Sequence, residues 1–446
     1  MILNLLNYSI VLAAAYLAAV AMLAIASALR AGGRRDDAGD DHEVLAASRF
    51  TIPVSIVVPV STTSCSIRRS VSALLELNYP EFEVIVVADA GQGVLEQLGR
   101  DWHLEAREFF YREMIETSAV RRIYRSERDP RLMVIDKTAA GFSDALNCGV
   151  NVARYRYLMS ADPDVIFDRD ALLRVMMAAL RDPANVIGAS NHVERGGSTW
   201  DDTPVATDRA TGDSAGPFAR LTRRFEQLAS ARSLMNSRLM WRNLSAGLGP
   251  ADSIVVWRRD ALIKANGFSA TAAEPSLDMM FRLQTAGADG GRFDRDAEVF
   301  GRVNPQSFRS AFRAAARRQR AALEIAAARV RSRARAFDTK TFLYFISCEI
   351  VTPAAQAWLL TGTLVGAALG WFSWTSVFFA AIALSFGNSA VSAAALLLRG
   401  ATAGAPLESE LRRLVAAGPL EFILYRSALG ASRLAATIAF AVGKNQ

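Results

Sequence analysis

The sequence predicts an α/β fold with a doubly wound parallel sheet, joined to transmembrane and interface helices. One observation behind this prediction is residues 54–60, VSIVVPV, a near-continuous apolar run with the length of a strand that is covered on both faces. A helical stretch over 67–77 then leads to another apolar strand at 84–87. Such a β-α-β unit has a right-handed crossover and builds doubly wound sheets. Composition is the third observation, since 51% of the 446 residues are hydrophobic, which favours membrane spans.

Residues 1–35 are expected to form an N-terminal transmembrane anchor. No charge occurs over 5–29, and a helix of that length rises about 37 Å, enough to cross a bilayer. Three arginines follow directly, so the positive-inside rule places the next segment in the cytoplasm. A cleaved signal peptide is the alternative, although the flank before the run lacks Lys and Arg and the run exceeds a signal core. Residues 36–48, acidic and rich in small residues, are expected to be a linker.

The excess of seven positive charges and the sequence pI near 9.6 favour an anionic partner. Because the basic residues cluster beside apolar segments, we expect that partner to be membrane phospholipid and not nucleic acid. The three cysteines, Cys65, Cys148 and Cys348, are widely spaced and form no C-x-x-C motif. They indicate a reducing compartment, without a disulfide framework or a zinc site.

Two carboxylates are predicted at the carboxyl end of a strand. A helix begins near Asp144, an apolar strand follows at 157–159, and Asp162 and Asp164 come shortly after it. In an open α/β sheet this edge is where ligands bind. Carboxylate oxygens are the ligands that a hard divalent cation requires, with a phosphate completing its shell. The alternative is an Asp-Pro-Asp turn between strand and helix, because both residue types favour turns.

The residues around this pair resemble a known family. Asp-Ala-Leu-Asn-x-Gly occupies 144–149, Ala153 and Tyr157 follow, and NYPEFEVIVVAD occupies 78–89. This order is similar to the donor-site segment and second strand of family-2 glycosyltransferases, particularly the membrane-embedded bacterial polysaccharide synthases. The resemblance covers nearly the whole chain. It implies a Rossmann-like, nucleotide-sugar-binding glycosyltransferase domain over 49–304 that faces the cytoplasm.

The resemblance also implies the members of a donor site. Asp89 would bind the nucleotide base, although an aspartate at a strand end is also a common turn residue. The family's first strand ends in Pro-x-x-Asn-Glu, whereas residues 59–63 read Pro-Val-Ser-Thr-Thr and lack the glutamate. Asp162 and Asp164 are the implied ligands of a Mg²⁺ or Mn²⁺ ion. The implied nucleotide-sugar-binding residues are Pro59, Ser61, Asp89, Asp144, Asn147, Asp162 and Arg317.

The general base of an inverting glycosyltransferase accepts the proton of the acceptor hydroxyl. The family places this base in a Glu-Asp pair shortly after Gly-Phe, and gapless counting from the Gly-Phe at 267–268 puts Pro275 and Ser276 there. The expected base is therefore missing at Ser276. Glu274 and Asp278 flank the gap and are the candidate catalytic residues. The alternative is that these two carboxylates complement the positive end of the helix that Pro275 begins.

Two further family motifs are altered. The family has Gly-Lys before Asp-Ala-Leu-Asn, where the ammonium meets the diphosphate. This chain has Gly-Phe at 141–142, and Lys137 would have to reach in from a loop. The family's Gln-x-x-Arg-Trp, which holds the pyrophosphate and the acceptor sugar, corresponds to Ala-Ala-Ala-Arg-Arg at 314–318. Arg317 is retained and can pair with phosphate bidentately, whereas Arg318 replaces the tryptophan.

The C-terminal third is expected to lie at and in the membrane. Basic interface helices are predicted over 305–340, where arginines are interspersed with alanines. Two transmembrane helices are predicted over 341–400, and Glu349, which is costly in lipid, should face protein or water. The tail 401–446 is expected to pack at the cytoplasmic interface, with a fourth span as the alternative. Within the soluble domain, the breaker-rich residues 194–217 are expected to form a long loop.

One main hypothesis follows: a multi-pass protein of the bacterial inner (plasma) membrane whose cytoplasmic domain transfers a sugar from a nucleotide-diphosphate sugar to a glycan or lipid-linked acceptor, in polysaccharide biosynthesis. The reaction would be that of an inverting hexosyltransferase, slowed by the altered motifs. Membrane lipids and other polysaccharide-synthesis subunits are the expected partners. The alternative is a catalytically inactive glycosyltransferase-like subunit that binds or scaffolds an active synthase. A transporter is disfavoured, because few spans with Glu349 as their ionisable residue make a poor pore.

Overall fold

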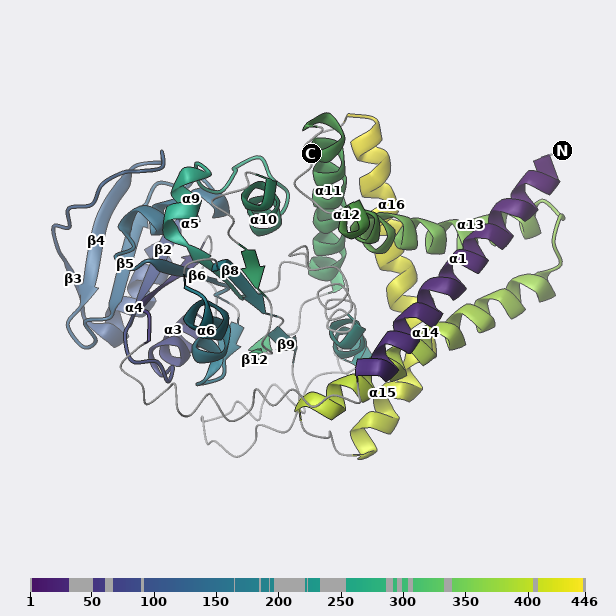
Figure 1. Ribbon diagram of the computed structural model, residues 1–446, viewed down its shortest axis with the longest axis horizontal. Coiled ribbons are helices and arrows are strands. Elements are labelled where there is room, and N and C mark those ends of the chain that lie inside the picture. Colours follow the sequence, from purple (N-terminus) through teal and green to yellow (C-terminus); the bar gives the residue numbers. More distant parts are fainter. Residues whose placement is uncertain are drawn as a thin grey trace.

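The sheet-containing domain and a bundle of long helices lie side by side (Figure 1). The N-terminal helix α1 (Ile2–Ala31) belongs to the bundle, together with the helices of the C-terminal third. The computed structural model describes residues 2–31, 51–60, 67–89, 92–163, 165–183, 186–191, 193–195, 221–222, 224–232, 254–285, 292–294, 299–303, 308–332, 339–403 and 408–443.

The larger sheet has the strand order β11-β8-β10-β6-β1-β2-β5-β4-β3. Its centre is parallel, because β1 runs parallel with β6 and β2, and β2 runs parallel with β5. Antiparallel strands flank this centre, with β10 next to β6 and β4 next to β5. The strands are Val54–Val60 (β1), Phe82–Asp89 (β2), Leu104–Ala106 (β3), Val120–Ser126 (β4), Leu132–Lys137 (β5), Tyr157–Ala161 (β6), Val186–Asn191 (β8), Ile254–Arg258 (β10) and Arg292–Asp294 (β11).

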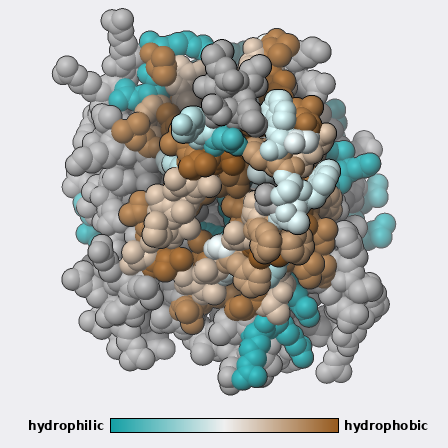
Figure 2. Space-filling view, turned by 90° about the vertical axis from the view of Figure 1, so that its right-hand side faces the viewer, coloured by the Kyte–Doolittle hydropathy of each residue, from teal (hydrophilic) through white to brown (hydrophobic). Residues whose placement is uncertain are grey.

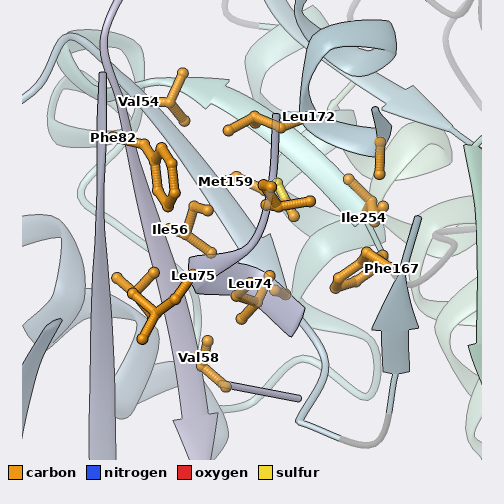
Figure 3. Close-up of a cluster of buried hydrophobic side chains, with 14 of the residues drawn as sticks. Val54, Ile56, Val58, Leu74, Leu75, Phe82, Met159, Phe167, Leu172 and Ile254 are labelled. Carbon is orange, nitrogen blue, oxygen red and sulfur yellow. The ribbon is translucent and has the colours of Figure 1, made fainter. Parts of the chain in front are cut away.

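Helices cover both faces of this sheet, so β1 and β2 are buried over their whole length. On one face, Val54, Ile56 and Val58 join a core with α3, α4 and α6 (Figure 3). On the other face, Val57 joins a core with α5, α9 and α10. The helices are Ile67–Leu75 (α3), Gln92–Trp102 (α4), Ala171–Arg181 (α6), Phe142–Val152 (α5), Arg259–Lys264 (α9) and Pro275–Thr285 (α10). The doubly wound, Rossmann-like arrangement is confirmed.

A smaller sheet continues the chain from the carboxyl end of β6. It has the strand order β7-β12-β9, in which β12 (Val299–Val303) pairs with β7 (Val165–Phe167) and β9 (Val193–Arg195). The backbone N–H of Val165 donates to the carbonyl of Asp162 over 3.2 Å. The short link between β6 and β7 is therefore a turn, as an Asp-Pro sequence favours.

The helical bundle is formed by α1 and the C-terminal third. Helix α1 packs against α13 and α14, and α11 packs along α16. The helices are Phe308–Ser332 (α11), Thr339–Ile346 (α12), Thr352–Ala368 (α13), Trp374–Ala403 (α14), Glu408–Leu420 (α15) and Ser427–Ala441 (α16), with π-helical turns at Ser347–Val351 (η4) and Glu421–Arg426 (η5). A helix of the sheet domain, residues 224–232, also packs into this bundle.

Three helices in the described part of the chain are long and apolar enough to cross a membrane. They cover Leu6–Leu23, Ser347–Ala368 and Val377–Leu397. Large hydrophobic side chains on these helices are exposed, among them Leu12 and Phe378. Figure 2 shows hydrophobic side chains gathered over the face of the molecule that these helices form.

The predicted elements are present with shifted boundaries. The helix expected to reach residue 77 ends at Leu75, and the segment expected as one span from residue 341 is divided into α12, η4 and α13. The tail forms α15, η5 and α16, none of which is among the candidate spans. Residues 194 and 195, expected at the start of a long loop, lie in β9. The rest of that loop and the linker 36–48 lie outside the described residues, and the domain boundaries stay predictions.

Candidate functional site

Four strand ends form one edge of the larger sheet. Because β6, β1, β2 and β5 are parallel neighbours, their carboxyl ends meet there. This edge brings together Pro59 near the end of β1, Asp89 at the end of β2 and Asp162 just after β6. The side chain of Asp162 is exposed. Ser61 and Asp164, also predicted for this site, lie outside the described residues.

The carboxylate of Asp89 is buried and receives three hydrogen bonds from the protein. The ammonium of Lys137 and the backbone N–H of Ala140 donate to its Oδ1 over 3.0 and 2.9 Å, and the N–H of Gly141 donates to Oδ2 over 2.8 Å. Both oxygens therefore hold the chain segment that follows β5. Its expected contact with a nucleotide base stays a prediction.

Lys137 is the last residue of β5 and is fully buried. Its ammonium pairs with Asp89 and also with Asp144 in the first turn of α5. Burial alone lowers the pKa of Lys137, but hydrogen bonds with these two carboxylates raise it above its usual value. The expectation that Lys137 reaches a diphosphate from a loop was wrong, because the strand register encloses its ammonium between two carboxylates.

Asp144 and Asn147, on successive turns of α5, contact protein groups. Asp144 accepts hydrogen bonds from the N–H and hydroxyl of Ser118 over 3.0 and 2.8 Å, and these bonds and Lys137 lower its pKa against the opposing effect of burial. Asn147 accepts from the N–H of Phe268 over 2.7 Å and donates to its carbonyl over 3.0 Å. It therefore holds the Gly-Phe turn at 267–268. Their expected contacts with a nucleotide sugar stay predictions.

Helix α10 begins at Pro275, as the sequence suggested, with Ser276 in its first turn. Asp278 forms an ion pair of 2.8 Å with Arg282, whose guanidinium also donates to the carbonyls of Ala265 and Gly267. Asp278 thus orients the arginine that fixes the turn before α10. This arrangement favours a positioning role for Asp278 over that of a general base.

A cleft of about 510 Å³ opens beside Asp144, Asn147 and Asp278, and its volume is within the usual size range of ligand pockets. Its walls come from α5, from the turn before α10 and from α10 itself. Its polar lining residues are Glu116, Asp144, Asn147, Asn266, Ser269, Asp278 and Arg282. The sequence did not point to Glu116 or Asn266 as site residues, because their approach depends on how distant elements pack.

A groove of about 400 Å³ adjoins this cleft, since Ser269 and Asp278 line both. It lies between α10 and α11 and reaches Phe440 of α16, with Glu274 and Glu324 among its polar lining. Partial burial raises the pKa of Glu274, and the nearby Arg317 and Arg318 offset this only in part. The Oε1 of Glu274 lies 3.8 Å from the Nε of Arg317.

The two arginines of the altered motif contact different carboxylates. Arg317 is exposed and faces Glu274. Its expected contact with a diphosphate stays a prediction. Arg318 makes two hydrogen bonds of 3.1 and 3.0 Å to Glu349 in η4. The expectation that Glu349 faces protein is confirmed.

A divalent cation would use oxygen ligands at the end of β6. Among the described residues no group of three or more metal-ligating side chains is found. A cation held by two carboxylates and a phosphate needs no such group. Asp162 has a ligand atom of the right kind, is exposed, and lies at the edge where the strands end. Asp162, the described member of the predicted pair, therefore fits a cation that binds together with a phosphorylated ligand.

Residues 115–230, which include α5, β6 and the Asp162 turn, match the family model of glycosyl transferase family 2. This part of the sheet-containing domain is therefore similar to glycosyl transferase family 2. The mannosyltransferase PcManGT from Pyrobaculum calidifontis, solved with GDP-Man and Mn²⁺, is similar in structure. The TM-score is 0.61 at 16% identity, over 99% of this chain and 100% of that chain, which shows a shared fold.

A second similar structure is S. aureus TarS 1–349 in complex with UDP-GlcNAc. Its TM-score is 0.36 at 14% identity, over 88% of this chain and 92% of that chain. None of the curated proteins matches the sequence. The family match over residues 115–230, the similar mannosyltransferase structure and the sheet topology together confirm the fold that the resemblance implied.

Proposed function

We propose that the chain is a membrane-bound inverting glycosyltransferase that transfers a sugar from a nucleotide-diphosphate sugar to an acceptor held beside the membrane helices. The observation that carries this proposal is the match of residues 115–230, which include Asp162 at the strand edge, to the family model of glycosyl transferase family 2. The same part of the chain contributes Asp144 and Asn147 to a cleft, and an adjoining groove leads toward α11 and α16. Nucleotide sugars are bound in the two similar structures.

Asp162 and Asp164 would hold a Mg²⁺ or Mn²⁺ ion. When bound, the ion would stabilise the charge of the departing diphosphate. Asp162 is well placed for this role because it is exposed at the carboxyl end of β6. The mannosyltransferase from Pyrobaculum calidifontis was solved with Mn²⁺.

Glu274 is the better candidate for the general base. Its raised pKa brings it closer to neutral pH, where a base is most effective, whereas Asp278 is paired with Arg282. The acceptor hydroxyl oxygen would form a bond to the sugar carbon while its proton passes to the Glu274 carboxylate. The bond from that carbon to the diphosphate would break, and its electron pair would leave on the nucleotide.

The acceptor would occupy the groove between α10 and α11. Its lining joins apolar side chains such as Phe281 and Ile325 to charged ones such as Arg320. This mixture suits a glycan or a lipid-linked acceptor that approaches from the membrane side. A bacterial inner membrane, a cytoplasmic domain and a role in polysaccharide biosynthesis fit the three apolar helices and the arginines after α1.

A catalytically inactive subunit that scaffolds an active synthase is the second candidate. The observation that favours it is that a serine, Ser276, stands where the family has its base, while the nearby Asp278 is paired with Arg282. Such a subunit would keep its donor pocket without turning a donor over.

Incubation of the purified full-length protein in detergent with a panel of UDP- and GDP-sugars and Mn²⁺ separates the two candidates. We expect slow hydrolysis or transfer with one donor, lost in Asp162→Asn. Asp260→Asn is the matched control, because Asp260 pairs with Arg258 at the other end of the adjoining strands β6 and β10. Donor binding without turnover by the wild-type protein would support the inactive subunit and contradict the enzyme.

A further inference from the structure

A buried ion cluster joins three elements at the proposed donor edge. Lys137 at the end of β5 pairs with Asp89 at the end of β2 and with Asp144 at the start of α5. Its ammonium also donates to the carbonyl of Thr138 over 2.8 Å. The Lys137 side chain has no exposed surface, and only 5% of Asp89 and 14% of Asp144 is exposed. No ligand can therefore touch the ammonium unless the cluster opens.

The cluster determines the path of the loop between β5 and α5. Asp89 receives the N–H groups of Ala140 and Gly141, and Asp144 receives both donors of Ser118. Gly141 has a φ of 96° and directly precedes α5, so the chain reverses there in a conformation that suits glycine. The carboxylate of Asp89 thus holds the backbone of this loop.

We infer that Lys137 is a positioning residue of the donor site: by pairing with Asp89 and Asp144 it fixes the loop from Thr138 to Gly141, and the N-terminus of α5, against the end of β2. This inference rests on the proposed function, because a donor would bind at this edge. Lys137 acts through the loop, since its enclosed ammonium does not reach a diphosphate.

Charge explains why the lysine is needed. Without its ammonium, two buried carboxylates would face each other, and one would have to take up a proton or move toward water. Either response pulls Asp89 away from the two loop N–H groups. A loop that is released in this way would have to be ordered again when the donor binds, and this cost weakens donor binding.

Lys137→Met in the full-length protein in detergent tests the inference by two measurements. We expect the KM for the donor sugar to rise by about 10- to 100-fold, with a smaller fall in kcat. We also expect faster hydrogen exchange at the amides of Ala140 and Gly141. Lys137→Arg keeps the charge and should lie between wild type and Lys137→Met in both measurements; it remains informative if Lys137→Met does not fold.

Arg154→Met is the matched control. Arg154, whose side chain is 45% exposed, pairs with the buried Glu83 over 2.8 Å near the amino end of the same strand, β2, so this variant leaves a buried carboxylate without its arginine at the opposite edge. We expect a similar loss of stability with an unchanged donor KM. An equal rise in KM for Arg154→Met would assign the effect to general weakening and overturn the inference.

The exchange measurement also separates this inference from the proposed function. If the wild-type protein turns over no donor, the proposed function fails, but the two loop amides still report on Lys137. Unchanged exchange at Ala140 and Gly141 in Lys137→Met would overturn the inference whatever the activity.

Discussion

Carboxylates of this domain differ in role because their neighbours differ. Asp89 and Asp144 are held by a buried lysine, and Asp278 is held by an arginine of its own helix. Asp162 is exposed at a strand end. Glu274 lines the groove between α10 and α11, and burial raises its pKa despite the nearby Arg317 and Arg318. The local environment of each residue, and not its type, therefore points to Glu274 as the acid-base group.

Replacement of Glu274 tests its role through the pH profile. A general base is active when unprotonated, so kcat/KM of the wild type should fall as the pH drops through the pKa of Glu274. Because that pKa is raised, the fall should begin at a higher pH than for an ordinary glutamate. Glu274→Gln should lower kcat by about 10²- to 10⁴-fold and remove this acid limb.

Glu324→Gln is the control for this measurement. Glu324 lines the same groove but pairs with Arg320 over 2.8 Å on α11. We expect this variant to keep the acid limb, whatever it does to the KM of the acceptor. An acid limb that persists in Glu274→Gln would contradict the assignment of the base.

Position 267 requires glycine because of both its backbone conformation and the atoms that surround it. Its φ is 69°, and an added Cβ would lie 2.5 Å from the Oδ1 of Asn147 and 2.8 Å from the Cγ2 of Ile115. Gly267→Ala should destabilise the protein by about 2–4 kcal/mol, from the left-handed backbone and the lost Asn147 hydrogen bonds. Thermal unfolding in detergent measures this. Gly99→Ala is the control, since nothing lies within 4 Å of its added Cβ.

The sequence pattern predicted those helices and strands whose formation depends on residues that are neighbours in the chain. The apolar runs at 54–60 and 84–87 are strands because a strand covered on both faces needs a continuous run of β-branched residues. Pro275 begins α10 because its ring suits the first helical turn. The boundaries of the predicted span differ where a tertiary contact is made. Glu349 lies in the π-helical turn η4, which divides that span, and it pairs with Arg318 of α11.

The Lys137 cluster could not be predicted, because its three members come together only when β2, β5 and α5 pack against one another. Asp89 and Lys137 are 48 residues apart and become direct neighbours when β2 and β5 pair in parallel. The sequence motif showed that Lys137 was not in the usual Gly-Lys position. It did not show that the ammonium was already neutralised inside the protein.

The two parts of the molecule are joined by the helix of residues 224–232, which lies between β9 and β10 in the chain. Residues Phe225 and Leu228 of this helix pack in one hydrophobic cluster with Leu396 of α14 and Leu414 of α15. Beside this cluster, Arg232 pairs with Glu421 of η5 and donates to the hydroxyl of Ser392 over 2.6 Å. A buried ion pair thus links the sheet-containing domain to the helices that are expected to lie in the membrane.

This link predicts how the two parts separate. Arg232→Met would leave Glu421 fully buried without its main partner, which typically costs 3–5 kcal/mol. We expect about 3 kcal/mol, the lower end of that range, because Arg426 also interacts with Glu421. The double variant Arg232→Met/Glu421→Leu removes both charges and should recover most of the loss. Limited proteolysis in detergent checks this, with faster cleavage between the domain and the bundle in the single variant only. Equal cleavage of both variants would show that packing of Phe225 and Leu228, and not the ion pair, holds the two parts together.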